Sequence, residues 1–148
     1  MAIRIALNVL SEKSGDLPQW QPWVFSGMPS AEAFTNISQL YFPEYLFTLF
    51  FLPGMLIQLF HLLFAGIGAF LLLRHFKCSD WAAGLGAIAF MITPYMVTMV
   101  VFGHGSQMMT AAYIPWVFWL TVRLYQNTNF SDTGWLAVLL GFQLQRGH

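Results

Sequence analysis

The stretch WAAGLGAIAFMITPYMVTMVVFGHGSQMMTAAYIPWVFWLTV, residues 81–122, contains no Asp, Glu, Lys or Arg. As one continuous helix it would be about 63 Å long, roughly twice the hydrocarbon thickness of a bilayer. Its only polar, helix-breaking cluster near the middle is GHGSQ at residues 103–107, where glycines weaken a helix and polar side chains favour water over lipid. We therefore expect a transmembrane hairpin, with helices at about 81–102 and 108–125 and a kink at Thr93-Pro94.

The composition of the chain is that of an integral membrane protein, because 57% of the residues are hydrophobic and 8% are charged, against about 25% charged in an ordinary soluble domain. Six Lys and Arg balance six Asp and Glu, so no basic excess points to a nucleic-acid partner. The single cysteine, Cys78, excludes an internal disulfide, and the four histidines lie too far apart for a local metal motif. We expect no nucleic-acid partner, no metal site and no bound cofactor.

A second apolar stretch, residues 45–73, carries no formal charge and is divided by Pro53-Gly54, where neither residue supports a continuous helix. The part before the division is too short to cross a bilayer, so we expect it to lie at the interface or to re-enter. The part after it, at about 54–73, is long enough to span, and its small residues at 65–69 allow a neighbouring helix to approach closely. Its lone histidine, His61, is expected to satisfy a helix–helix hydrogen bond rather than to serve chemistry.

Basic residues between the apolar stretches set the expected orientation. Three of them cluster in the link at residues 74–80, which the positive-inside rule places in the cytoplasm. The chain returns to that side at 123–132 and then begins a further crossing at about 133–145. We therefore expect an all-α, polytopic transmembrane helix bundle of about three to four spans over residues 45–148.

Residues 1–44 are expected to form an extracytoplasmic region rich in aromatic residues, Pro and Gly, in which a short amphipathic helix at 1–10 is followed by a loop. The densest part of this loop is WQPWVFSGMP, residues 20–29. Tryptophans beside a membrane lie at headgroup depth whatever the protein does, so an interfacial anchor and a binding loop are both open interpretations. On the expected topology the loop, the 103–107 turn and the terminal Arg-Gly-His at 146–148 share one face, which is the expected functional face.

Four motifs follow one another along the chain: WQPWVFSGMP at 20–29, GHGSQ at 103–107, AAYIPW at 111–116 and LQRGH at 144–148. In these motifs and their spacing the chain resembles the YfhO-like bacterial membrane proteins, relatives of the GT-C glycosyltransferase superfamily. The resemblance implies a multi-pass enzyme of the bacterial inner (cytoplasmic) membrane that takes a sugar from a polyprenyl-phosphate carrier and places it on a lipid or cell-wall polymer at the outer face. Membrane lipids and the lipid-linked sugar donor are then the expected partners.

The start of the chain departs from the superfamily pattern. Members usually carry a catalytic acidic residue in the first outer loop, shortly after a first transmembrane helix, and no such helix precedes the loop here. The resemblance thus implies that the chain is a fragment, that the base lies in the upstream part of its full-length protein and that the fragment alone is inactive. Asp16 matches a later part of the loop and is a secondary candidate base, the alternative being a solvated carboxylate.

Glycosyl transfer from a phosphate-linked sugar needs an acidic base near the acceptor and cationic or hydrogen-bonding groups for the departing phosphate. His104, which lies between two glycines, is expected to bind sugar or phosphate, and Arg146 with His148 to stabilise the leaving group. The alternatives are a turn residue for His104 and an ordinary helix end for the other two. Trp20 and Trp23 are expected to stack on the sugar or to hold the lipid carrier.

A non-enzymatic membrane transport or assembly subunit is the alternative function. Coupling ions and charged substrates usually need ionisable groups at mid-membrane. No Asp, Glu, Lys or Arg lies in the middle of any expected span, which favours the enzyme.

Overall fold

The computed structural model describes residues 20–21, 28–29 and 41–146, and every regular element in them except one short ladder is helical. The ladder is antiparallel and pairs Trp20 with Pro29 and Gln21 with Met28. The elements are β1 Trp20–Gln21, β2 Met28–Pro29, α3 Phe42–Leu49, α4 Gly54–His75, α5 Asp80–Met91, α6 Pro94–Val101, α7 Gly105–Ala112, α8 Ile114–Gln126 and α9 Phe130–Arg146. The expected helical class is confirmed for this part of the chain.

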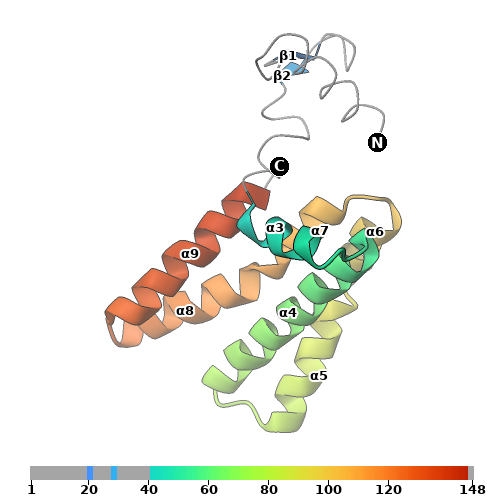
Figure 1. Cartoon of the computed structure of the whole chain (residues 1–148). Helices are drawn as coiled ribbons and strands as arrows, with labels where there is room; N and C mark the ends of the chain where they lie inside the picture. Colours follow the sequence, from blue (N-terminus) through green and yellow to red (C-terminus); the bar gives the residue numbers. More distant parts are fainter. Residues whose placement is uncertain (1–19, 22–27, 30–40, 147–148) are drawn as a thin grey trace.

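The longer helices form two hairpins, α4 with α5 and α6, and α8 with α9 (Figure 1). The links that close the two hairpins lie at the lower end of the molecule in that view, which we call the link end. The turn at 102–104, α3, α7 and the C-terminal end of α9 lie at the opposite end, which we call the turn end. The two links expected on one side of a bilayer therefore share one end of the fold.

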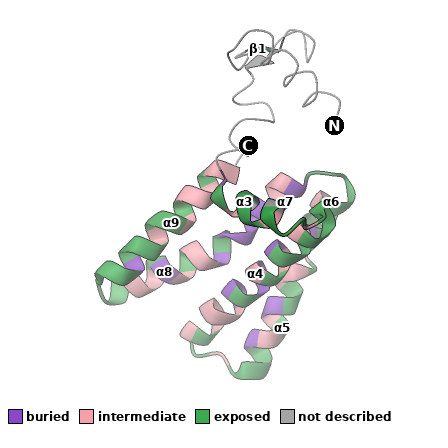
Figure 2. Cartoon of the chain, in the orientation of Figure 1, coloured by how far each residue is buried: buried purple, intermediate pink, exposed green. Residues whose placement is uncertain are grey.

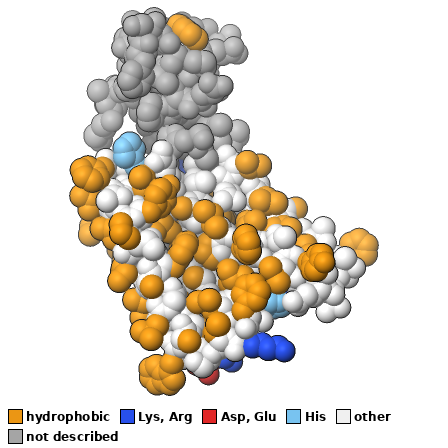
Figure 3. Space-filling view, turned by 180° about the vertical axis from the view of Figure 1, so that it is seen from behind, with side chains coloured by type: hydrophobic (Ala, Val, Ile, Leu, Met, Phe, Trp, Pro, Cys, Tyr) orange, Lys and Arg blue, Asp and Glu red, His pale blue; other side chains and the backbone are white. Residues whose placement is uncertain are grey.

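Among the described residues, two helical segments are long and apolar enough to cross a bilayer: α4 at Gly54–His75, and α5 with α6 at Asp80–Val101. Large apolar side chains also cover the outer surface, and Phe51, Trp81 and Phe130 are 92%, 87% and 98% exposed. Figure 3 shows apolar side chains spread over the described part of the rear face, with charged side chains gathered at the link end. Such a surface is suited to lipid and supports association with a membrane.

Few residues are buried, and Figure 2 shows them as short patches on helices that are otherwise exposed or half-buried. The central cluster consists of Ala65 of α4, Met96 of α6, and Met108, Met109, Ala111 and Ala112 of α7. Small residues bring the first hairpin together, since an added Cβ would meet Met91 at Gly66 and Leu73 at Gly86. The close helix approach expected at residues 65–69 is thereby confirmed.

Prolines divide both helices that the sequence predicts for the 81–125 hairpin. Pro94 begins α6, so the kink expected at Thr93-Pro94 is a complete break between α5 and α6. Thr93 has a ψ of 145°, because the proline ring disfavours helical backbone in the residue before it. The helix expected at 108–125 is likewise divided into α7 and α8, which meet at Tyr113 with Pro115 in the first turn of α8.

The turn expected at 103–107 is shorter than predicted, because α7 already begins at Gly105. Gly103 has a φ of +79°, a backbone conformation that glycine adopts without strain. Gly105 is buried, and a Cβ added there would meet the side chain of Gln58 on α4. This packing against α4 outweighs the low helix propensity on which the longer turn was predicted.

Candidate functional site

An apolar cavity of about 650 Å³ lies between α3, α4 and α9. Aromatic and aliphatic side chains form most of its wall, among them Leu46, Phe47 and Phe50 of the α3 segment, Phe60 and Phe64 of α4, and Phe142 of α9. Tyr41, His61 and Tyr113 add polar groups to the same wall. The volume is in the range of roughly 300–1,000 Å³ that ligand pockets occupy, and the lining suits a hydrocarbon chain.

Tyr41 is the centre of a buried chain of hydrogen bonds in the cavity wall. It is 1% exposed, its hydroxyl lies 2.8 Å from His61 Nε2, and the same hydroxyl is hydrogen-bonded to the hydroxyl of Tyr113. His61 Nδ1 lies 2.8 Å from the carbonyl oxygen of Ile57, which can only accept, so Nδ1 carries the proton. In the neutral ring Nε2 then accepts from Tyr41, and the Tyr41 oxygen accepts from Tyr113.

Arg146, in the last turn of α9, adds a cation to this chain of hydrogen bonds. Its guanidinium carbon lies 4.9 Å from the centre of the Tyr41 ring, and two of its nitrogens lie 3.2 and 3.0 Å from Met109 Sδ. Thr110 Oγ1 donates to the Arg146 carbonyl oxygen at 2.9 Å, which ties the end of α9 to α7. A positive charge therefore lies one ring away from the apolar cavity.

An amphiphilic anion fits these groups chemically. The cavity suits a hydrocarbon chain, and the Arg146 guanidinium provides N–H donors that a phosphate accepts. Among the side chains that the structure describes, no Asp or Glu lines the cavity. Those residues also contain no group of three His, Cys, Asp or Glu that could hold a metal ion. The described part of the site therefore offers binding groups rather than a carboxylate base.

Arg146 is the predicted site residue that the structure places in this cluster. Trp20 is 55% exposed in β1. Asp16, Trp23 and His148 lie outside the described residues, as does the helix expected at residues 1–10. Their roles in binding or catalysis stay predictions.

His104 lies in the turn before α7, where its carbonyl oxygen accepts from the backbone N–H groups of Gln107 and Met108 at 3.1 and 3.3 Å. Its side chain makes no capping hydrogen bond to the helix. The flanking glycines that suggested a ligand have structural reasons, since Gly103 has a positive φ and Gly105 packs against α4. Substrate binding by His104 stays a prediction that rests on its position.

Tyr41 and Tyr113 are site residues that the sequence analysis missed. The partners of Tyr41 lie 20 and 72 positions away along the chain, and no local spacing indicates such contacts. The AAYIPW motif contains Tyr113 but gives it no role. The sequence does mark His61 as a lone polar group in an apolar helix, but in place of the expected helix–helix hydrogen bond its ring is bonded to Ile57 of its own helix and to Tyr41, which precedes α3.

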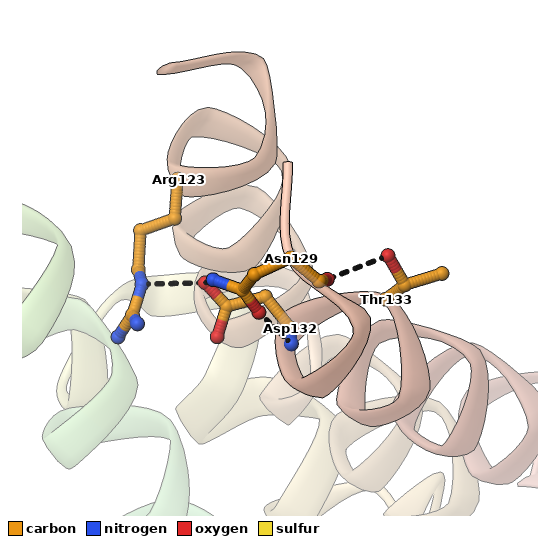
Figure 4. A network of polar contacts seen from close by, with 4 residues as sticks. All are labelled: Arg123, Asn129, Asp132 and Thr133. Atoms are coloured by element: carbon orange, nitrogen blue, oxygen red, sulfur yellow. Dashed lines mark hydrogen bonds and ion pairs between the residues drawn. The ribbon is translucent and has the colours of Figure 1, made fainter. Parts of the chain in front are cut away.

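A second polar cluster lies at the link end, where α8 meets α9 (Figure 4). Arg123 Nε donates to Asp132 Oδ2 at 2.9 Å, and Asn129 Nδ2 donates to the same oxygen at 3.1 Å. Asn129 Oδ1 accepts from the backbone N–H of Asp132 at 2.7 Å, the contact of a helix N-cap. This cap explains why α9 begins at Phe130, earlier than the expected 133.

A cavity of about 500 Å³ adjoins this second cluster. Its lining includes Phe64, Trp116, Trp119, Trp135 and Leu139, together with Arg123 and Asp132. The guanidinium carbon of Arg123 lies 4.8 Å from the centre of the Trp119 ring. Phe64 and Leu139 line both cavities, so the two adjoin where α4 faces the second hairpin.

No protein-family model, no curated protein and no solved structure matches this chain. The function therefore has to be inferred from the chain's own residues and their geometry. The candidate sites are the Arg146 cluster and the Arg123–Asp132 cluster, each of which lies beside an apolar cavity.

Proposed function

We propose that this chain is part of a multi-pass enzyme of the bacterial inner membrane, of the YfhO-like type, which transfers a sugar from a polyprenyl-phosphate carrier to a lipid or cell-wall polymer at the outer face. The observation that carries the proposal is the apolar cavity of about 650 Å³ whose wall holds Tyr41, His61 and Tyr113, with Arg146 stacked on Tyr41. A polyprenyl phosphate has the two matching parts, a long hydrocarbon chain and an anionic head.

In this proposal the cavity holds isoprene units of the carrier and Arg146 binds its phosphate. When the bond between the sugar's anomeric carbon and the phosphate oxygen breaks, negative charge grows on the departing phosphate. A fixed cation therefore stabilises the transition state more than the bound donor. His61 and Tyr113 hold the Tyr41 ring in place, so the guanidinium stacks on a rigid surface.

The remaining parts of the proposal concern orientation and the catalytic base. α8 and α9 complete a bundle of three to four spans, with the link end in the cytoplasm and the turn end outside. The phosphate site then lies at the outer face, where Trp20, Trp23 and His104 bind the sugar. Asp16 is the secondary candidate for the base.

A photoactivatable polyprenyl phosphate tests the binding step on the full chain in detergent. We expect crosslinks on α3, α4 and α9 that excess polyprenyl phosphate removes and that the same amount of polyprenol does not remove. Arg146→Gln should lower the crosslinking about tenfold, because a charge-assisted contact to the phosphate is lost. Arg74→Gln is the matched control, since Arg74 lies in the link 74–80 at the other end of the fold, and it should leave the crosslinking unchanged.

Equal displacement by polyprenol, or unchanged crosslinking in the Arg146→Gln variant, would contradict a phosphate site. Either result would favour the non-enzymatic membrane transport or assembly subunit. In the full-length protein, sugar transfer from a radiolabelled polyprenyl-phosphate sugar should fall with the same substitution. A variant that binds the carrier normally but transfers no sugar would place Arg146 in the chemical step rather than in binding.

A further inference from the structure

Both hairpin links carry an Arg–Asp ion pair, and the two pairs have the same N–O distance but differ in burial. The distance from Arg Nε to the carboxylate oxygen is 2.9 Å in Arg74–Asp80 and in Arg123–Asp132. The side chains of the first pair are 43% and 76% exposed, whereas those of the second are 38% and 8% exposed. The second pair also lines the cavity of about 500 Å³ at the link end. The second pair therefore differs from the first in its burial and in its contact with a cavity.

Arg123 has hydrogen-bond donors that the ion pair does not use. Only Nε is aimed at the Asp132 carboxylate, as Figure 4 shows. The two terminal nitrogens have no hydrogen-bond partner among the residues that the structure describes, and the guanidinium is stacked on Trp119. Since the side chain is 38% exposed, these donors are open to a ligand that brings acceptor oxygens.

The rest of the cavity wall is apolar and mostly aromatic. Trp116, Trp119 and Trp135 line it, and Phe64 stacks on Trp116 with ring centres 4.8 Å apart. Tryptophan at the end of a membrane-embedded bundle is typical of the headgroup region of a bilayer. A ligand that contacts both parts of this wall carries an anionic oxygen group and a hydrocarbon chain on the same molecule.

We propose that this cavity binds one glycerophospholipid, with its phosphodiester on the terminal nitrogens of Arg123 and an acyl chain along Trp116 and Phe64. Asp132 lines the same cavity and neutralises Arg123, so the site recognises the phosphodiester and does not require a headgroup with net negative charge. The site lies at the opposite end of the fold from the Arg146 cluster. Its polar contact, Arg123, is not part of the Arg146 cluster, so its test is separate from that of the proposed function, although Phe64 and Leu139 line both cavities.

Native mass spectrometry of the full chain in detergent, with added phosphatidylcholine, tests this site. We expect one lipid per chain to survive activation that strips more weakly held lipids. Arg123→Gln should lower its retention about tenfold or more, because the charge-assisted bonds to the phosphodiester are lost. Arg74→Gln should retain the lipid as the wild type does. Diacylglycerol with the same acyl chains, which lacks the phosphodiester, should be retained no better than phosphatidylcholine is by the Arg123→Gln variant.

A substitution of the acidic partner separates lipid binding from the ion pair. Asp132→Asn breaks the same pair but keeps the guanidinium, so lipid retention should be equal to or higher than in the wild type. Loss of the lipid to the same extent in Asp132→Asn and Arg123→Gln would show that the pair serves structure alone and would overturn the proposal. Equal retention of diacylglycerol and phosphatidylcholine by the wild type would also overturn it.

Two further measurements keep the test decisive. If circular dichroism shows that the Arg123→Gln variant does not fold, Arg123→Lys replaces it, since lysine keeps the charge that pairs with Asp132 but carries its donors on one nitrogen and lacks the guanidinium fork that reaches the carboxylate and the phosphodiester from separate nitrogens. Wild-type lipid retention by Arg123→Lys would contradict the proposed contact. Excess inorganic phosphate should leave the lipid bound, because phosphate lacks the acyl chains, and displacement at millimolar phosphate would show an anion site rather than a lipid site.

Discussion

The two hairpins of this chain are closed by different means. In the first, small residues let the helix backbones approach, as where Gly66 of α4 lies against Met91 of α5. In the second, the ion pair of Arg123 and Asp132 holds the helices together near their link. Both cavities lie where α4 faces the second hairpin. The first hairpin is therefore a packed scaffold, and the second leaves space for ligands beside it.

The ion pairs of the two links show that burial, and not distance, sets their expected contribution to stability. An exposed pair such as Arg74–Asp80 contributes about 0–1 kcal/mol, because water and salt screen it. The carboxylate of Asp132 is 8% exposed, so removing its charge leaves Arg123 without the partner that compensates its desolvation. The two pairs have equal N–O distances but different burial, so the same Asp→Asn substitution is expected to cost unequal amounts of the free energy of unfolding.

The largest expected effect is all-or-none labelling of the two ends of the hairpins by a membrane-impermeant maleimide in intact cells. Cys78, in the first link, should not react, because the proposed topology, which follows the basic residues beside it, has that link in the cytoplasm. In a Cys78→Ser background, Asn127→Cys in the second link should also be protected. Phe102→Cys at the turn end, where the native side chain is 74% exposed, should react.

A membrane-permeant maleimide should label all three cysteines and controls for their reactivity. Reaction of Cys78 but not of Phe102→Cys would invert the proposed topology and move the Arg146 cluster to the cytoplasmic side. Reaction at only one of the two links would show that the two links do not lie on the same side of the membrane. In that case the second hairpin would not be a pair of spans.

Asp132→Asn should cost about 2–3 kcal/mol of the free energy of unfolding, toward the lower end of what breaking a buried pair costs because Arg123 is 38% exposed. Asp80→Asn is the matched change in the first link and should cost less than about 1 kcal/mol. Denaturant unfolding of the detergent-solubilised chain, followed by circular dichroism, measures both. Equal costs would remove the distinction between the two links.

Much of the fold follows from local features of the sequence. The apolar runs define α4 and the α5–α6 segment, and the small residues near Gly66 predict the close approach in the first hairpin. The proline breaks are harder to predict, because a proline in an apolar run can kink a helix or begin a new one. Pro94 and Pro115 both lie in the first turn of a new helix, and the packing of α7 against α4 decides that outcome.

The candidate sites are harder to predict from the sequence than the fold, because their contacts join distant parts of the chain. Arg146 could be singled out as a cation at the end of an apolar segment. Its stacking on Tyr41 and the bond from Tyr41 to Tyr113 bring together α9, the residue before α3 and the junction of α7 with α8, and no spacing in the sequence encodes that packing. His104 shows the opposite case, in which a conspicuous turn motif is accounted for by backbone geometry and packing.

Gly68→Ala should loosen the contact between the two hairpins and cost about 1–3 kcal/mol of the free energy of unfolding. An added Cβ at Gly68 would lie 2.5 Å from Trp116 Nε1, which donates a hydrogen bond of 2.7 Å to the carbonyl oxygen of Phe64. Gly84→Ala is the control, because a Cβ there meets nothing within 4 Å and alanine favours helix by about 1 kcal/mol. Unfolding followed by tryptophan fluorescence compares the two. A Gly68→Ala variant as stable as Gly84→Ala would show that the hairpins do not depend on this contact.

The smallest expected effect concerns the hydrogen bond between Tyr41, which precedes α3, and Tyr113, which lies between α7 and α8. Tyr113→Phe removes the donor to the Tyr41 oxygen but leaves the bond from Tyr41 to His61, so it should cost about 0.5–1.5 kcal/mol of the free energy of unfolding. Tyr41→Phe removes both bonds and should cost about twice as much, since each bond contributes a similar amount. The order of the two costs follows from the number of bonds that each substitution removes, because Tyr41 is bonded to both His61 and Tyr113. A cost for Tyr113→Phe equal to that of Tyr41→Phe would mean that the bond to His61 adds nothing to stability.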